Sequence, residues 1–236
     1  MKLSLTLVGP AFLAAALFAP LAAQAQTTHT YTGNGKIGFS GYLGKGSLTV
    51  SSDKKGNITF SLAPHGGSLG GNAVALYIDS TPGGFANTSQ FSDNGDPGHE
   101  IVSGANTGSN PHINGTHTPS RSLVTFAPGF KADYAISFEG GFVGVFKLAA
   151  GKDNSLIYVM GAGQKAAPYT LTIPGSKIGV SPGRSFKFVG SLINGTGAYR
   201  SNETLGTITP GSTEPVPGFN RSVTFTNFDT FTTSAH

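Results

Sequence analysis

The stretch DYAISFEGGFVGVFKLA, residues Asp133–Ala149, decides the fold. Apolar and polar residues alternate on both sides of Glu139-Gly140-Gly141, and alternation across a Gly-Gly centre is typical of a β-hairpin. The side chains that give these two runs their apolar bulk, mostly aromatic or β-branched, are Ala135, Phe138, Phe142, Val145 and Phe146. We expect the hairpin to lie in the middle of the principal sheet.

Segments of the same kind precede and follow this hairpin. Ser47–Ser51 and Asn57–Leu62 alternate cleanly around a turn, and Ala73–Asp79 is a continuous apolar run, typical of a strand in the interior of a sheet. Further strands are expected at His99–Ser103, Ser122–Phe126, Ser155–Met160, Tyr169–Ile173, Phe186–Asn194 and Arg221–Thr232, with one helical turn within Ile173–Gly179. No segment has sustained helical periodicity. The sequence therefore predicts an all-β fold of about ten strands, a sandwich of two antiparallel sheets with jelly-roll or immunoglobulin-like layering.

The first 25 residues have the pattern of a secretory signal peptide. Lys2 precedes an apolar run, Ala11–Ala23, and Ala23-Gln24-Ala25 is a small-x-small cleavage site. Cleavage after Ala25 leaves residues 26–236 as one β domain. No other apolar stretch is long enough to span a membrane. We expect a secreted protein, periplasmic or extracellular, with no membrane span in the mature chain.

The charge and cysteine content exclude several classes of function. The chain has 15 basic and 11 acidic residues, and loss of Lys2 leaves 14 against 11, a net charge of +3. The basic residues are scattered and form no stripe, which argues against a nucleic-acid partner. The absence of cysteine excludes thiol catalysis and thiolate metal sites. No phosphate-binding loop or H-E-x-x-H motif is present, and nothing in the sequence places a serine beside a base held by an acid, so we expect no enzymatic activity.

A loop rich in acidic residues follows the Ala73–Asp79 strand. Three acidic residues fall within Asp93–Glu100, and oxygen ligands in a glycine-rich loop suit calcium. The predicted calcium ligands are Asp79, Asp93, Asp96 and Glu100; the alternative is an ordinary solvated turn, since Asp, Asn, Gly and Pro also form turns. A hydrolase that uses these carboxylates is a weaker hypothesis, because acid and base catalysis needs two carboxylates fixed across a cleft. His99, His112 and His117 follow in the same passage and are interpreted as loop histidines rather than zinc ligands.

A second candidate site follows the Phe186–Asn194 strand and a glycine-rich turn. Its residues are Tyr199, Arg200, Asn202 and Glu203. Planar side chains with paired donors and acceptors suit sugar hydroxyls, so this segment is a candidate ligand site. Alternatively, Arg200 and Glu203 form a structural ion pair that fixes the loop.

The order of four segments resembles a family of exported bacterial β-sandwich proteins, the DOMON-like and family 9 carbohydrate-binding-type modules, including the C-terminal module of glucodextranase-like enzymes. The segments are LYIDSTPGGF (76–85), FAPGFKADYAISFEGGFVGVFKL (126–148), SPGRSFKFVGSLING (181–195) and AYRSNE (198–203). The resemblance extends over roughly Gly38–Phe231 and implies a non-catalytic module of two packed sheets, sometimes with calcium and often with a carbohydrate ligand. The chain departs from the family in having no tryptophan, so a sugar would stack on Tyr or Phe. Haem-binding relatives use Met and His, and only Met160 could serve here.

Two functions are therefore expected. The first is an exported, carbohydrate-binding-like module for a polysaccharide or cell-surface glycan, with no cofactor other than the predicted calcium. The alternative is a structural or adhesive protein of the cell surface or extracellular matrix.

Overall fold

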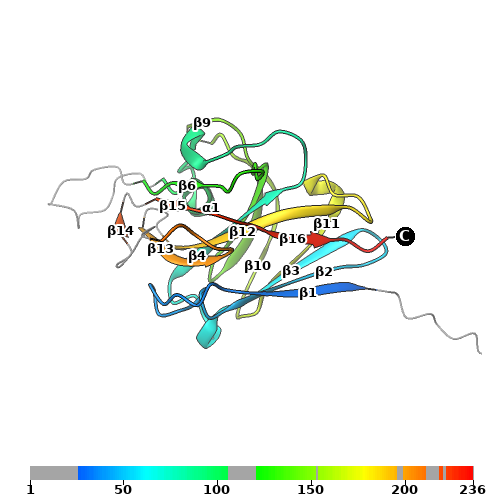
Figure 1. The fold of residues 1–236 in the computed structure, drawn as a ribbon, viewed down its shortest axis with the longest axis horizontal. Coiled ribbons are helices and arrows are strands. Elements are labelled where there is room, and N and C mark those ends of the chain that lie inside the picture. Colours follow the sequence, from blue (N-terminus) through cyan, green and yellow to red (C-terminus); the bar gives the residue numbers. More distant parts are fainter. Residues whose placement is uncertain are drawn as a thin grey trace, which may run out of the picture.

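The structure is a computed structural model that describes residues 26–105, 121–152, 154–195, 199–210, 218–219 and 222–235. The predicted signal peptide, His112 and His117 lie outside the described residues. Two antiparallel sheets pack face to face, which confirms the predicted all-β sandwich (Figure 1). The described part contains sixteen strands, five of them only two residues long, so the expected count of about ten was too low.

The smaller sheet has the strand order β1-β2-β3-β11. Its strands are β1 (Thr27–Thr32), β2 (Ser47–Ser52), β3 (Asn57–Ala63) and β11 (Tyr169–Pro174). β2 and β3 form the predicted hairpin, with Val50 opposite Phe60. Apolar side chains alternate along both strands and are fully buried at Leu48, Val50, Ile58 and Phe60, so one face of this sheet lies on the core.

The larger sheet has the order β10-β8-β7-β4-β12-β13-β14, and β16 also pairs with β12. Its strands are β4 (Asn72–Asp79), β7 (Tyr134–Phe138), β8 (Phe142–Lys147), β10 (Ile157–Gly163), β12 (Ser185–Asn194), β13 (Tyr199–Leu205), β14 (Gly218–Phe219) and β16 (Asp229–Thr232). The predicted hairpin is confirmed as β7 and β8, joined at Glu139. It is not in the middle of the sheet, as was expected; β4 and β12 lie there. Residues 199–205, which form β13, were predicted to be a loop because their polar side chains gave no strand pattern.

Both faces of the larger sheet are covered. Val74, Leu76 and Ile78 of β4 face the smaller sheet and belong to the core between the two sheets. Ala73, Ala75 and Tyr77 face the opposite way, into a second core. Full burial of one large apolar side chain stabilises the fold by about 1.5–3 kcal/mol. Each core, with many such side chains, therefore contributes substantially to the free energy of unfolding. The continuous apolar run of β4 is explained by this burial on both faces.

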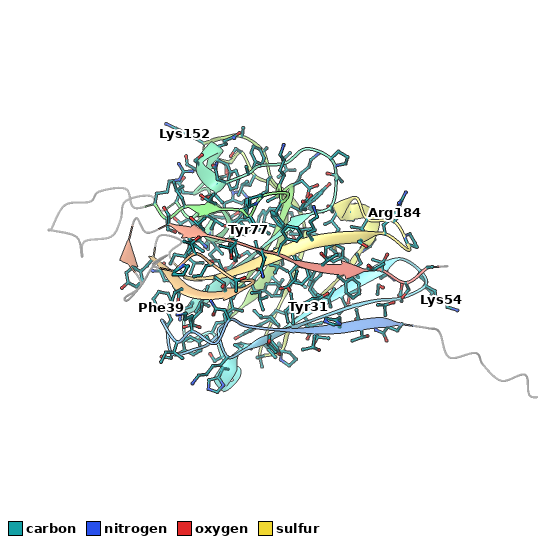
Figure 2. All side chains as sticks on the ribbon, viewed as in Figure 1. Tyr31, Phe39, Lys54, Tyr77, Lys152 and Arg184 are labelled. Carbon is teal, nitrogen blue, oxygen red and sulfur yellow. The ribbon has the colours of Figure 1, made fainter. Side chains whose placement is uncertain are left out.

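The second core is closed by a layer of short elements (Figure 1). These are η2 (Thr88–Gln90), β5 (Phe91–Ser92), α1 (Pro97–Ser103), β6 (Val124–Thr125), β9 (Gly151–Lys152) and β15 (Val223–Thr224). Two further 3-10 turns are η1 (His65–Gly67) and η3 (Gly175–Ile178), the latter confirming the predicted helical turn. Tyr77 lies inside the molecule, whereas Lys54, Lys152 and Arg184 lie at its periphery (Figure 2).

Residues 99–103 are helical, and the expected strand there was wrong. Asp96 caps α1 by accepting a hydrogen bond from the His99 N–H at 2.9 Å, and Pro97 occupies the first turn. Gly104, with φ of 69°, ends the helix in the left-handed conformation. These start and stop signals outweighed the strand preference of Ile101 and Val102.

No helix in the described ranges has both the length and the hydrophobicity needed to cross a bilayer.

Candidate functional site

The predicted ligand residues Tyr199, Arg200, Asn202 and Glu203 lie on β13. Arg200 and Glu203 are both fully buried, and Asn202 is 5% exposed. The two charged side chains have different partners: Glu203 accepts from backbone N–H groups and Arg200 donates to serine hydroxyls, so they do not form the ion pair of the alternative. Tyr199 stacks on Phe39 with ring centroids 5.3 Å apart. Three of these side chains are buried, and the fourth, Tyr199, packs on another ring of the protein. A role for them in ligand binding stays a prediction.

Glu203 fixes the segment that connects β1 to β2. Its Oε1 accepts hydrogen bonds from the N–H groups of Phe39 and of Gly41, the latter at 3.0 Å. Its Oε2 accepts from Leu43 at 2.9 Å and from Gly44 at 3.2 Å. Four backbone donors in a segment without regular structure are thus satisfied by one carboxylate.

Arg200 lies in the second core, on the opposite face of β13. Its Nε and Nη1 donate to the hydroxyls of Ser122, at 3.2 Å, and Ser191, at 3.0 Å. Its Nη2 has no hydrogen-bond partner among the described residues. No carboxylate of the described ranges lies within ion-pair distance of this guanidinium. Burial lowers the pKa of Arg200, partly offset by the nearby Tyr77 hydroxyl.

The four predicted calcium ligands have other partners. Asp79, at the end of β4, pairs with Lys187, with 3.3 Å between Oδ2 and Nζ. Asp96 caps α1, and Glu100 lies within that helix. Asp93 is fully buried and accepts hydrogen bonds from the N–H groups of Gly95, Asn154 and Leu156, at 2.9, 2.8 and 2.7 Å. Within the described part of the chain, no three or more His, Asp or Glu side chains are grouped as metal ligands.

We therefore expect calcium to leave the thermal stability unchanged. Melting temperatures with a chelator, with about 10 mM calcium and with about 10 mM magnesium should agree within about 1 °C, because a weak site occupied at these concentrations would raise the midpoint by several degrees. The measurement is thermal unfolding followed by circular dichroism. A rise specific to calcium would restore the metal site of the sequence prediction.

A pocket of about 280 Å³ opens beside these acidic residues. It is formed by the start of α1, the β7–β8 turn, β8 and β10, and its lining residues are Asp96, Pro97, Gly98, Glu139, Phe142, Phe146 and Tyr158. Phe142 and Phe146 lie on the same face of β8, four residues apart, and Tyr158 of β10 is directly opposite Phe146. The rings of Phe146 and Tyr158 are 6.0 Å apart at 65°. The pocket therefore combines three aromatic rings with two carboxylates.

Glycines set the positions of the two phenylalanine rings. A Cβ on Gly98 of α1 would lie 2.7 Å from Cζ of Phe146, and one on Gly144 of β8 would lie 2.9 Å from Cε1 of Phe142. A Cβ on Gly161 of β10 would also overlap the Phe142 ring. Contacts this short do not occur between real side chains, so any larger residue would displace the rings. The shape of the pocket thus depends on these three small residues.

Asp93 joins the two walls of the pocket. Its hydrogen bonds from Asn154 and Leu156 hold the segment that leads into β10, and its bond from Gly95 holds the segment that leads into α1. Burial alone would raise the pKa of Asp93, but these backbone hydrogen bonds, with a smaller contribution from His99, lower it below its usual value. The side chain is therefore charged at neutral pH and keeps both walls in place.

His99 lies behind the aromatic wall. Its ring packs edge-on against Phe146, with centroids 4.9 Å apart. Its Nδ1 is 3.2 Å from Oδ1 of Asp93 and its Nε2 is 3.7 Å from Oδ2 of Asp96, although neither contact is aligned as a hydrogen bond. His99 is thus a buried histidine rather than the exposed loop histidine expected from the sequence.

Glu139 is the half-buried acid of the pocket. Burial raises its pKa, and the negative charge of Asp96 raises it further, while a hydrogen bond from the Ser137 hydroxyl at 3.0 Å lowers it. A half-buried acid beside a second carboxylate favours a positively charged or hydrogen-bond-donating neighbour.

The chain was compared with protein-family models, with curated proteins and with solved structures, and none of the three comparisons found a match. The resemblance to the DOMON-like and family 9 modules therefore stays a hypothesis.

Proposed function

We propose that this protein is an exported, non-catalytic binding module that holds a carbohydrate unit in the pocket between α1, β8 and β10. The observation that carries the proposal is the placement of three aromatic rings beside two carboxylates in one pocket. The apolar C–H face of a sugar ring packs on an aromatic side chain, and sugar hydroxyls donate to carboxylates. The volume is near the lower end of the range for small-molecule sites, which suits one or two sugar rings.

The ring at the mouth of the pocket is the best candidate for contact with the ligand. Tyr158 is 54% exposed, so a ligand can reach this side chain from solvent. In this proposal the sugar ring stacks on Tyr158, as it does on tryptophan in many sugar-binding modules. The exported part of the proposal depends on the sequence pattern of residues 1–25.

Replacement of Tyr158 by alanine is expected to weaken glycan binding by about tenfold or more, because a central aromatic contact usually contributes more than 1.4 kcal/mol. The matched control is Ile157→Ala, since Ile157 is the preceding residue of β10, is also 54% exposed and does not line the pocket. Ligands are found with a glycan array, and affinities follow from titration calorimetry. Equal affinities of the two variants would contradict the proposed site, and release of shorter sugars from the ligand would contradict the non-catalytic assignment.

The alternative is a structural or adhesive protein that assembles with itself. One observation favours it: β10 ends the larger sheet in the described part of the chain and carries two exposed apolar side chains, Ile157 and Tyr158. Exposed sheet edges of this kind pair readily with other strands. Concentration-dependent assembly in light scattering, without saturable glycan binding, would support this function instead.

A further inference from the structure

We propose that the carbohydrate held by this pocket carries free amino groups, as in an oligosaccharide of glucosamine. This inference depends on the proposed function and adds the chemical class of the sugar. It follows from three features of the pocket: its charge, the positions of its acids relative to its rings, and the charge of the rest of the molecule.

The pocket has two acids and no basic residue among its lining side chains. Asp96 is exposed at the start of α1, and Glu139 is half-buried at the β7–β8 turn. The charge of Asp96 raises the cost of ionising Glu139, and neither carboxylate has a described lysine or arginine within ion-pair distance. Of the charged groups behind the pocket, Asp93 adds negative charge, and His99 lies between Asp93 and Asp96. An ammonium group of a ligand would supply the missing positive charge.

The acids and rings are arranged for one ligand that is both cationic and ring-shaped. Phe142 follows the β7–β8 turn that carries Glu139, and Phe146 contacts Gly98 of α1, two residues after Asp96. The carboxylates and the aromatic rings thus line the same pocket. An ammonium group near the faces of these rings gains from the ring quadrupole as well as from the carboxylates. A neutral sugar would use the rings and hydroxyl acceptors but would leave the carboxylate charges unpaired.

The rest of the chain makes non-specific attraction of a cationic sugar unfavourable. The net charge of residues 26–236 is +3, from 14 basic and 11 acidic residues, so a polycation is repelled by the molecule as a whole. Binding of an amino sugar would therefore have to come from a local acidic site, and the pocket is such a site.

The test compares oligosaccharides of glucosamine, N-acetylglucosamine and glucose that share one linkage and one length and differ only in the substituent at carbon 2. At about pH 6, where such amines are protonated, the glucosamine oligomer is expected to bind about tenfold more tightly than the other two. Glu139→Gln should remove this preference, so that this variant binds the glucosamine and glucose oligomers with affinities that agree within about twofold, since the glutamine oxygen accepts hydrogen bonds but attracts no ammonium group. Asp53→Asn, in the β2–β3 turn, makes the same charge change away from the pocket and should keep the preference.

Each outcome decides one of the two proposals. Equal affinities for all three oligomers, or tighter binding of the neutral ones, would overturn the amino-sugar inference while leaving the proposed function standing. If none of the three oligomers binds measurably, the amino-sugar inference and the proposed carbohydrate-binding function are both overturned for these sugars. A preference for the glucosamine oligomer that Asp53→Asn abolishes as fully as Glu139→Gln does would show general electrostatic attraction and contradict a site in this pocket.

Discussion

Glu203→Gln is expected to lower the melting temperature by about 6–12 °C, which corresponds to a loss of about 3 kcal/mol in the free energy of unfolding. The glutamine side chain keeps one acceptor oxygen. Its amide nitrogen replaces the oxygen that accepts from Leu43 and Gly44, so donors would face donors in a fully buried site. The loss includes the stronger hydrogen bonds that a charged acceptor makes.

Glu139→Gln is the matched control for this variant. It makes the same chemical change at a half-buried residue with one described donor, the Ser137 hydroxyl, and is expected to cost less than about 1 kcal/mol. Hydrogen exchange gives a second measurement: the amides of Gly41, Leu43 and Gly44 should exchange faster in Glu203→Gln than in the parent protein. A midpoint within about 2 °C of the parent protein, with unchanged exchange at these amides, would show that Glu203 does not hold the segment.

The second large effect is expected at Arg200, where two substitutions should have opposite outcomes. Arg200→Met removes a buried charge that has two hydroxyl acceptors and, in the described part of the chain, no carboxylate partner, and it keeps a long side chain. Desolvation of a charge costs several kcal/mol, so this variant is expected to be as stable as the parent protein or up to about 2 kcal/mol more stable. Arg200→Ala leaves a cavity in the second core and should be about 2–5 kcal/mol less stable than Arg200→Met.

Urea unfolding of the three proteins measures these differences directly, and equal slopes would show that the unfolded states are comparable. The expected order of stability is Met equal to or above Arg, with Ala lowest. If Arg200→Met is destabilised as much as Arg200→Ala, then the charge itself, through its bonds to Ser122 and Ser191, stabilises the second core.

The fold class was predictable because burial on one face or on two leaves a pattern in the sequence. Alternation across Glu139-Gly140-Gly141 predicted the β7–β8 hairpin, and the unbroken apolar run predicted the buried strand β4. The helix α1 was predictable in principle from Asp96, Pro97 and Gly104, but the apolar residues between them resemble a strand. β13 was not predictable from its pattern, since its buried residues are mostly polar.

Only part of the candidate site could be predicted from the sequence. The acidic residues of Asp93–Glu100 and the hairpin around Glu139 were each noticed, but nothing in the sequence shows that they meet. Asp96 and Glu139 are far apart along the chain, and the pocket exists because α1 lies over β8 as part of the layer that covers the larger sheet. In the sequence, Phe142 and Phe146 counted only as apolar bulk of the hairpin, and Phe146 does pack in the second core. That both also line a pocket depends on Gly98, Gly144 and Gly161.

The sequence by itself determined the all-β class, the strands of strong alternation and the lack of thiol chemistry, because these follow from local pattern and residue type. The tertiary structure alone decided the roles of the charged residues. Whether a carboxylate such as Asp93, Glu139 or Glu203 holds a backbone segment or lines a pocket depends on which donors the fold brings to it. Those donors come from distant parts of the chain, and hydrogen bonds of that kind leave no periodic trace in a single sequence.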